Sequence, residues 1–130
     1  MEIKVFSSLP KDALDLRITV FVDEQGFVDE VDEADDFATH LVMYDDEKAV
    51  ATCRFFLKED KETYMFGRLC VLKEYRGKSF GREMLKKKFK KRLYNVYINF
   101  IFADYFTIRF HYNRAVVGNE VVTFEALLLI

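Results

Sequence analysis

Arginine, lysine and glycine residues follow one another closely in the segment Arg76-Gly-Lys-Ser-Phe-Gly-Arg82. A turn that leads into a helix presents free backbone N–H groups, and nearby cations add a favourable potential for an anion. Glycine at such a turn lets the backbone come close to a ligand. The segment therefore predicts an anion site, and phosphate is the anion that we expect there.

The elements before this turn follow from the spacing of apolar residues. Strands are predicted over 2–7, 40–44, 49–57 and 63–72, with turns at 45–48 and 59–62 that indicate three consecutive antiparallel strands. A helix is predicted between Pro10 and Gly26, from positions at helical spacing: Leu14, Arg17, Ile18 and Phe21. Residues 29–36 are so acidic that we expect a solvated loop.

The elements after the turn are an amphipathic helix, with an apolar stripe from Phe80 to Leu93, and a buried strand over 96–103. Residues 105–114 favour a short helix, and 116–124 favour a last strand or a strand pair around Gly118 and Asn119. With 130 residues and no linker or repeat, we expect a single domain spanning 1–130.

Charge is distributed unevenly along the chain. Residues 1–65 carry 17 acidic and 7 basic side chains, whereas residues 66–130 carry 5 and 13, although the net charge is only −2. The basic half suits a polyanionic ligand, and the acidic half disfavours nucleic acid while tolerating an amine. No apolar run is long enough to cross a bilayer and the N-terminus does not resemble a signal peptide, so we expect a cytoplasmic protein without a membrane partner.

The cysteines and histidines are too few and too scattered to predict a metal site. Cys53 and Cys70 lie in strand-like runs without CxxC spacing, and two buried free thiols are the expectation. His40 and His111 remain only as single acid or base candidates.

Two phosphate-bearing ligands are candidates for the turn, a nucleoside triphosphate and coenzyme A. Gly77-Lys78-Ser79 is the end of a P-loop for a nucleoside triphosphate, but Leu72 stands where that motif needs a glycine, and antiparallel strands precede it. The alternative is coenzyme A. Arg76 and Gly81 match the [Q/R]-x-x-G-x-[G/A] signature of the GNAT acyltransferases, with Ser79 at the position of the middle glycine.

The chain resembles the GNAT family over roughly residues 14–92. The segment 66–78 is similar to the family's core motif, and 16–26, the acidic loop and 38–41 are similar to the small bacterial branch related to ElaA and YjcF. The resemblance implies an α/β (α+β) GNAT fold with a mixed central sheet of about six to seven strands, antiparallel in its N-terminal part and flanked by helices. The family's Gly-Phe ending does not follow Phe110-His-Tyr112.

The resemblance implies acetyl-CoA (coenzyme A) as cofactor. The pantetheine arm would pair with backbone groups of Leu69, Cys70 and Val71, one of which could also polarise the thioester carbonyl. The pyrophosphate would lie at the turn formed by Arg76, Gly77, Lys78, Ser79, Phe80, Gly81 and Arg82. Cys70 is expected to pack rather than attack.

The activity that the resemblance implies is direct N-acetylation of a small-molecule or protein amine. Tyr112 is the candidate acid, with His111 as the neighbouring alternative, and Glu24 is the candidate base. His40 and Gln25 are candidate substrate contacts. A non-catalytic acyl-CoA-binding or regulatory module remains the alternative, a P-loop nucleotide binder a more distant one, and a homodimer is left open.

Overall fold

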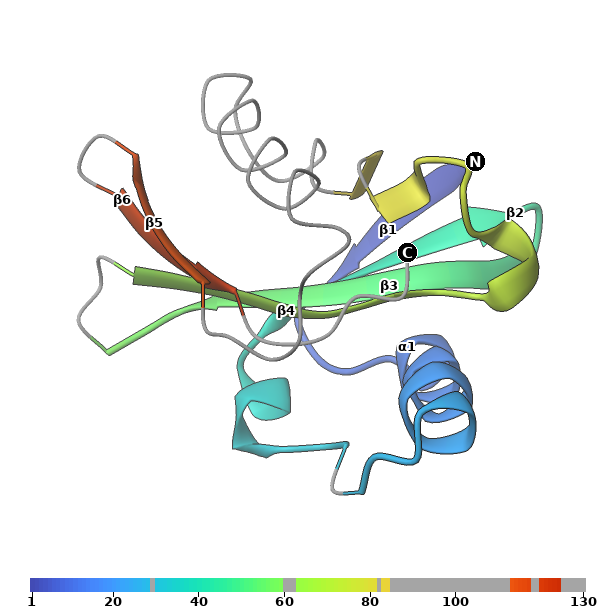
Figure 1. Ribbon diagram of the computed structural model, residues 1–130, viewed down its shortest axis with the longest axis horizontal. Coiled ribbons are helices and arrows are strands. Elements are labelled where there is room, and N and C mark those ends of the chain that lie inside the picture. Colours follow the sequence, from blue (N-terminus) through green and yellow to red (C-terminus); the bar gives the residue numbers. More distant parts are fainter. Residues whose placement is uncertain (29, 60–62, 82, 85–112, 118–119, 125–130) are drawn as a thin grey trace.

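The computed structural model describes residues 1–28, 30–59, 63–81, 83–84, 113–117 and 120–124. These residues form a six-stranded mixed sheet in the order β1-β2-β3-β4-β6-β5 (Figure 1). The predicted α/β class with a mixed sheet is confirmed. The strands are β1 (Glu2–Phe6), β2 (Thr39–Asp45), β3 (Lys48–Leu57), β4 (Thr63–Val71), β5 (Asn113–Val117) and β6 (Glu120–Phe124).

The first four strands are antiparallel neighbours in the sheet. The predicted antiparallel order of β2, β3 and β4 is confirmed, and β1 joins it by pairing with β2. Asp45 pairs with Lys48 at the β2–β3 hairpin, and Asp46 in its turn has a φ of 52°. Aspartate tolerates this left-handed conformation better than most residues because its short side chain can hydrogen-bond locally. The acidic turn at 45–48 therefore fixes the register of β2 on β3.

The second half of the sheet is joined on by a parallel pairing. β4 pairs with β6 over Thr63–Phe66, and β6 pairs antiparallel with β5. The strand pair predicted around Gly118 and Asn119 is confirmed, whereas a helix reaching Arg114 is wrong, because Asn113 and Arg114 begin β5. The strand predicted over 96–103 and most of the helix after the turn lie outside the described residues.

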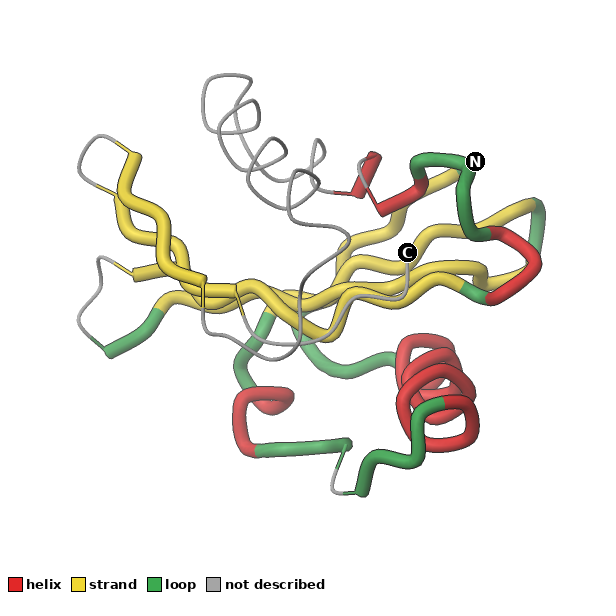
Figure 2. Tube along the Cα trace, in the orientation of Figure 1, coloured by secondary structure: helices red, strands yellow, loops and turns green. Residues whose placement is uncertain are grey.

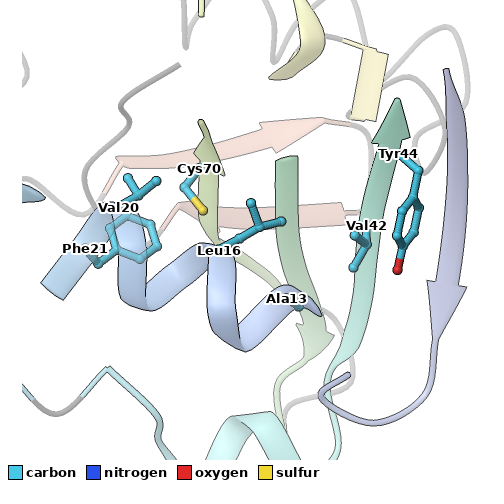
Figure 3. Packing of buried hydrophobic residues seen from close by; sticks show 7 residues of the cluster. All are labelled: Ala13, Leu16, Val20, Phe21, Val42, Tyr44 and Cys70. Carbon is cyan, nitrogen blue, oxygen red and sulfur yellow. The ribbon is translucent and has the colours of Figure 1, made fainter. Parts of the chain in front are cut away.

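One helical unit covers one face of the sheet (Figure 2). α1 (Lys11–Arg17) continues into η1 (Ile18–Glu24), a wider π-type helix, so the predicted helix is confirmed in extent. Its buried face differs from the predicted stripe, since Ile18 is 39% exposed. Figure 3 shows the buried cluster in which Ala13, Leu16, Val20 and Phe21 of this helical unit pack with Val42 and Tyr44 of β2 and Cys70 of β4.

The acidic segment before β2 is only in part the solvated loop that its composition predicts: Asp32, Glu33 and Asp36 are exposed, but the segment also has buried and helical parts. It contains the short helix η2 (Glu33–Asp36), which lies on the same side of the sheet as α1 (Figures 1 and 2), and the Asp35 side chain is buried. Its carboxylates alternate with arginines in a closed circuit of ion pairs, which we call the charge ring. Its pairs are Arg17–Glu30, Glu30–Arg68, Arg68–Asp32, Asp32–Arg54, Arg54–Asp35 and Asp35–Arg17.

Burying charged groups costs free energy, and the charge ring offsets this cost because each of its charges has hydrogen-bonded partners. The Arg17 guanidinium donates to both Asp35 carboxylate oxygens at 2.7 and 2.9 Å. Burial opposes ionisation of Asp35, but hydrogen bonds from Arg17 and Arg54 outweigh it and hold the pKa of Asp35 far below its usual value. Three carboxylates of the segment, Glu30, Asp32 and Asp35, thus neutralise the three arginines, whereas Glu33 and Asp36 are exposed.

Candidate functional site: the end of β4 and the turn after it

The last residues of β4 combine a buried face with an irregular backbone. The side chains of Leu69, Cys70 and Val71 are at most 1% exposed. β4 has a bulge here, because Thr52 of β3 lies opposite Cys70 while Arg54 lies opposite Gly67. In the described part of the chain, β6 pairs with β4 only up to Phe66, so no described strand covers the other edge of β4 beyond it. A bulge of this kind re-aims the backbone groups next to it.

The chain then makes a short turn, residues 76–79, which we call the β4 turn. It follows η3 (Lys73–Tyr75), and both Gly77 and Ser79 have positive φ, 77° and 63°. Ser79 therefore adopts the left-handed conformation that favours glycine. The Ser79 carbonyl accepts a hydrogen bond from the Glu83 N–H at 3.1 Å, which closes the first turn of the following helical backbone.

The other predicted cofactor contacts of this segment surround the turn. The Lys78 side chain is exposed, and its ammonium lies 5.2 Å from the centroid of the Tyr75 ring. The Phe80 ring is half-buried at 6.0 Å from Tyr75, and Gly81 is buried. The turn thus brings backbone N–H groups and an exposed cation to one place, which is the chemistry that an anion requires. Arg82 lies outside the described residues.

Arg76 and Glu24 are paired with each other. The Arg76 guanidinium donates to both Glu24 carboxylate oxygens at 2.9 Å, and its Nε donates to the Val71 carbonyl at 2.9 Å. Both side chains are partly exposed, at 18% and 28%. The structure thus brings together two residues predicted for different roles, a phosphate contact and a base. Arg76 ties the end of β4 to the end of η1, and its charge is shared with Glu24.

His40 and Gln25 are both withdrawn from solvent. His40 is 1% exposed, and its Nε2 lies 3.3 Å from the Asp35 carbonyl oxygen. Burial lowers the pKa of His40, so the ring is neutral at physiological pH. The carboxamide nitrogen and oxygen of Gln25 are buried, with no hydrogen-bond partner among the described residues. His40 is a buried core residue of β2, and its role as a substrate contact remains a prediction that this burial does not favour.

The two thiols lie in the core. Cys53 and Cys70 are free and buried, as predicted. Burial raises the pKa of both thiols far above the ordinary value. Because the thiolate is the nucleophile, neither cysteine is suited to form an acyl-enzyme.

The candidate acid, a metal site and a membrane-spanning helix were also considered in the sequence. Tyr112 and His111 lie outside the described residues, so the candidate acid stays a prediction. Among the residues that are described, no cluster of three His, Cys, Asp or Glu side chains could hold a metal ion. No helix of this part of the chain is both long and apolar enough to cross a bilayer.

The sequence analysis did not predict that the arginines of the charge ring lie on the side of the sheet covered by α1 and pair with the acidic segment. Arg17 and Arg54 are each 1% exposed, and Arg68 has a positive φ of 52° in the bulge of β4. A signal was present, because each arginine interrupts an otherwise apolar helix face or strand. A buried charge needs partners, and the nearby excess of carboxylates at 30–35 supplies them.

Comparisons with known proteins agree with this geometry. The model of the acetyltransferase (GNAT) domain family matches residues 36–115, which include β2, β3, β4 and the β4 turn. YjcF of Bacillus subtilis, described as an uncharacterised N-acetyltransferase, is 37% identical over 78 residues, covering 58% of this chain and 54% of its own length. The chain thus spans about half the length of this curated relative.

Solved structures show the same fold. Escherichia coli ElaA is 27% identical with a TM-score of 0.59, covering 66% of this chain and 65% of its own. An acyl-CoA N-acyltransferase from Pseudomonas aeruginosa has a TM-score of 0.58 at 24% identity, covering 66% of each chain. The family match, the ElaA and YjcF relatives and the mixed sheet lead to one conclusion: the chain belongs to the GNAT acetyltransferase family.

Proposed function

We propose that this protein binds acetyl-CoA at the end of β4 and transfers the acetyl group directly to an amine. The observation that carries the proposal is the β4 turn, where Gly77 and Ser79 both have left-handed backbones beside an exposed lysine. Successive backbone N–H groups in such a turn form a concave anion site that suits a pyrophosphate. Membership of the GNAT family supports acyl-CoA as the source of that pyrophosphate. We propose that the single domain spans residues 1–130 and acts in the cytoplasm.

In the proposed complex, the pantetheine arm lies along the edge of β4 beyond Phe66, which no described strand covers, and hydrogen-bonds to backbone groups of Leu69, Cys70 and Val71. The buried side chains of these residues stay in the core, so the ligand contacts only the backbone. The pyrophosphate lies at Gly77 to Arg82, where Lys78 supplies charge. A backbone N–H beside the bulge polarises the thioester carbonyl, as an oxyanion donor does in acyl transfer.

The proposed reaction has no covalent acyl-enzyme. The acceptor amine gives up a proton to a base, its nitrogen attacks the thioester carbon and a C–N bond forms, the C–S bond breaks, and the CoA thiolate takes a proton from the acid. The raised pKa of the Cys70 thiol supports direct transfer. This thiol lies in the strand that is proposed to bind pantetheine, and it is a poor nucleophile because it is rarely ionised. Tyr112 is the proposed acid.

Glu24 needs a separate statement because it is bound to Arg76. As the base, it would have to take the proton of the amine while keeping or releasing this pair. As an anchor, it would only hold Arg76 in place. Glu24→Gln separates the two roles: loss of a base lowers the turnover number by on the order of 100-fold with CoA affinity retained, whereas loss of an anchor changes affinity and leaves turnover at saturation nearly intact.

The test of the proposed function is titration calorimetry of the full chain with acetyl-CoA and, in parallel, ATP. We expect binding of acetyl-CoA and not of ATP, since the antiparallel β1–β4 sheet does not suit a P-loop. Lys78→Glu should weaken acetyl-CoA binding by about tenfold, or about 1.4 kcal/mol.

The matched control is Lys73→Glu, which makes the same charge change at an exposed lysine of η3 before the turn. Equal effects of the two variants would point to general electrostatics, and no effect of either would remove the pyrophosphate from the β4 turn. Acetyl-CoA binding without acetylation of any amine in a broad panel would favour the acyl-CoA-binding module over the enzyme.

A further inference from the structure

The charge ring and the β4 site share one residue, Arg68. Its backbone lies in the bulge of β4, where two residues, Arg68 and Leu69, lie opposite Cys53 alone. Its φ of 52° is in the left-handed region that residues with a Cβ seldom adopt. Such a conformation persists only where the surrounding structure over-determines it. The next three residues are the ones whose backbone is proposed to bind pantetheine.

The side chain of Arg68 reaches away from this edge and into the charge ring. Its Nε lies 3.1 Å from a Glu30 carboxylate oxygen, and it also donates to the Glu30 carbonyl at 3.3 Å. A terminal nitrogen donates to Asp32 at 3.1 Å. The side chain is 17% exposed; of its two carboxylate partners, Glu30 is 9% exposed and Asp32 is 41% exposed.

Glu30 and Asp32 are themselves held from the other side. The Nε of Arg17, in α1, donates to Glu30 at 2.7 Å, and a terminal nitrogen of Arg54, in β3, donates to Asp32 at 2.8 Å. Both of these arginines bond to Asp35, which closes the ring. Arg68 is therefore gripped by two carboxylates whose own positions are fixed by buried arginines on α1 and on the neighbouring strand.

We propose that Arg68 is a positioning residue for acyl-CoA: the charge ring holds its left-handed backbone, and this fixes the bulge that presents the backbone of Leu69 to Val71 to the ligand. The proposal rests on the proposed function of the β4 edge. Arg68 touches neither the ligand nor the reacting atoms, and it acts only through the backbone of its own strand. The acidic segment before β2 is then part of the cofactor site at a distance.

Two substitutions separate the side chain from the backbone conformation. Arg68→Gly permits a positive φ but removes the grip of the ring, whereas Arg68→Lys keeps a cation that can reach one carboxylate. We expect acetyl-CoA affinity to fall about tenfold in the glycine variant and to recover in part with lysine. Amide hydrogen exchange at Leu69, Cys70 and Val71 should be slowest in the unaltered protein, intermediate in Arg68→Lys and fastest in Arg68→Gly.

Affinity and exchange are measured at a temperature where every variant is fully folded, so that global unfolding does not contribute. Tyr44→Phe is the control for a general loss of stability, because it removes a hydrogen bond to Asp12 of 2.7 Å that takes no part in the charge ring. It should lower the melting temperature without changing affinity or exchange in β4. A glycine variant that binds acetyl-CoA as tightly as the unaltered protein, with unchanged exchange, would overturn the proposal.

The two measurements, acetyl-CoA affinity and amide hydrogen exchange, also separate this inference from the proposed function. Failure of the unaltered protein to bind any acyl-CoA would refute the proposed function. The exchange measurement needs no ligand, so it still decides whether the ring positions the bulge. If the melting temperature of Arg68→Gly falls while exchange at Leu69 to Val71 stays unchanged, Arg68 serves global stability alone and the inference is wrong.

Discussion

The charge ring and the β4 turn use charged residues in opposite ways. In the ring, three arginines and three carboxylates satisfy one another, and four of the six side chains are less than 10% exposed. At the turn, the backbone is left-handed at Gly77 and Ser79, and the Lys78 side chain faces solvent. The charges of the ring are neutralised inside the fold, whereas we propose that the exposed cation of the turn serves to bind the phosphates of acyl-CoA. The count of charges along the chain does not distinguish the two uses.

The largest expected effect comes from breaking the ring at its most buried carboxylate. Asp35→Asn leaves the Arg17 and Arg54 guanidinium groups facing a neutral amide, so we expect a loss of about 3–5 kcal/mol in the free energy of unfolding. Urea denaturation measures it. Asp36→Asn, at the exposed neighbouring position, is the control and should change stability by less than about 0.5 kcal/mol. A loss below about 1 kcal/mol for Asp35→Asn would mean that the ring contributes little.

Acid should open the ring before it affects the turn. The pKa values of Asp32 and Asp35 are lowered, in Asp32 chiefly by hydrogen bonds from Arg54. The stability that they contribute is therefore complete above about pH 4, the ordinary carboxyl pKa, and is lost as pH falls further. The lowered pKa of His40 adds a smaller loss that begins below about pH 6.5.

Thermal unfolding between pH 7 and pH 3 tests both parts of this dependence. The melting temperature should fall gently below pH 6.5 and steeply below pH 4. His40→Gln should remove the first part, and Asp35→Asn should flatten the second. A melting temperature that is constant from pH 7 to pH 3 would contradict the role of the ring.

A smaller effect is expected at the first left-handed residue of the turn. Gly77 has a φ of 77°, and an added Cβ would meet no atom within 4 Å. Gly77→Ala should therefore cost only backbone strain, about 1–2 kcal/mol. Chemical denaturation measures this cost, and an unchanged free energy of unfolding would show that the turn relaxes to negative φ.

The smallest effect should be a gain of stability at Ser79. Ser79→Gly relieves the strain of a φ of 63°, but glycine also increases the entropy of the unfolded chain. We expect a net stabilisation of at most about 1 kcal/mol, with acetyl-CoA affinity not weakened. The opposite sign would mean that the serine hydroxyl stabilises the turn by more than the strain costs.

The sequence was sufficient for elements that depend on local pattern. The antiparallel β1–β4 order, the helix ending before Gly26 and the turn after β4 follow from periodicity and from glycine, proline and aspartate positions. Glycine-like geometry at Ser79 could be anticipated only from the family signature, because serine itself does not favour positive φ.

The charge ring could not be predicted because it joins four separate segments. Composition assigned residues 29–36 to solvent, and the helical stripe included Arg17 without a partner. The ring forms through tertiary contacts. α1, β3 and β4 each contribute one arginine, and the three arginines pair with carboxylates of the one acidic segment. The Glu24–Arg76 pair is similar, since its two residues are 52 positions apart.

The parallel pairing of β4 with β6 has a consequence for the order of folding. The pairs β2–β3 and β3–β4 join strands linked by short turns, so the loops that must close are short, whereas the segment between β1 and β2 holds α1, η1 and η2. Thr63–Phe66 instead waits for Val121–Phe124, which lies almost half the chain away. Closing a long loop costs more entropy than closing a short one, and non-local contacts slow folding. The sheet should therefore fold in two kinetic stages, with β1–β4 formed while β4 still has an unpaired edge.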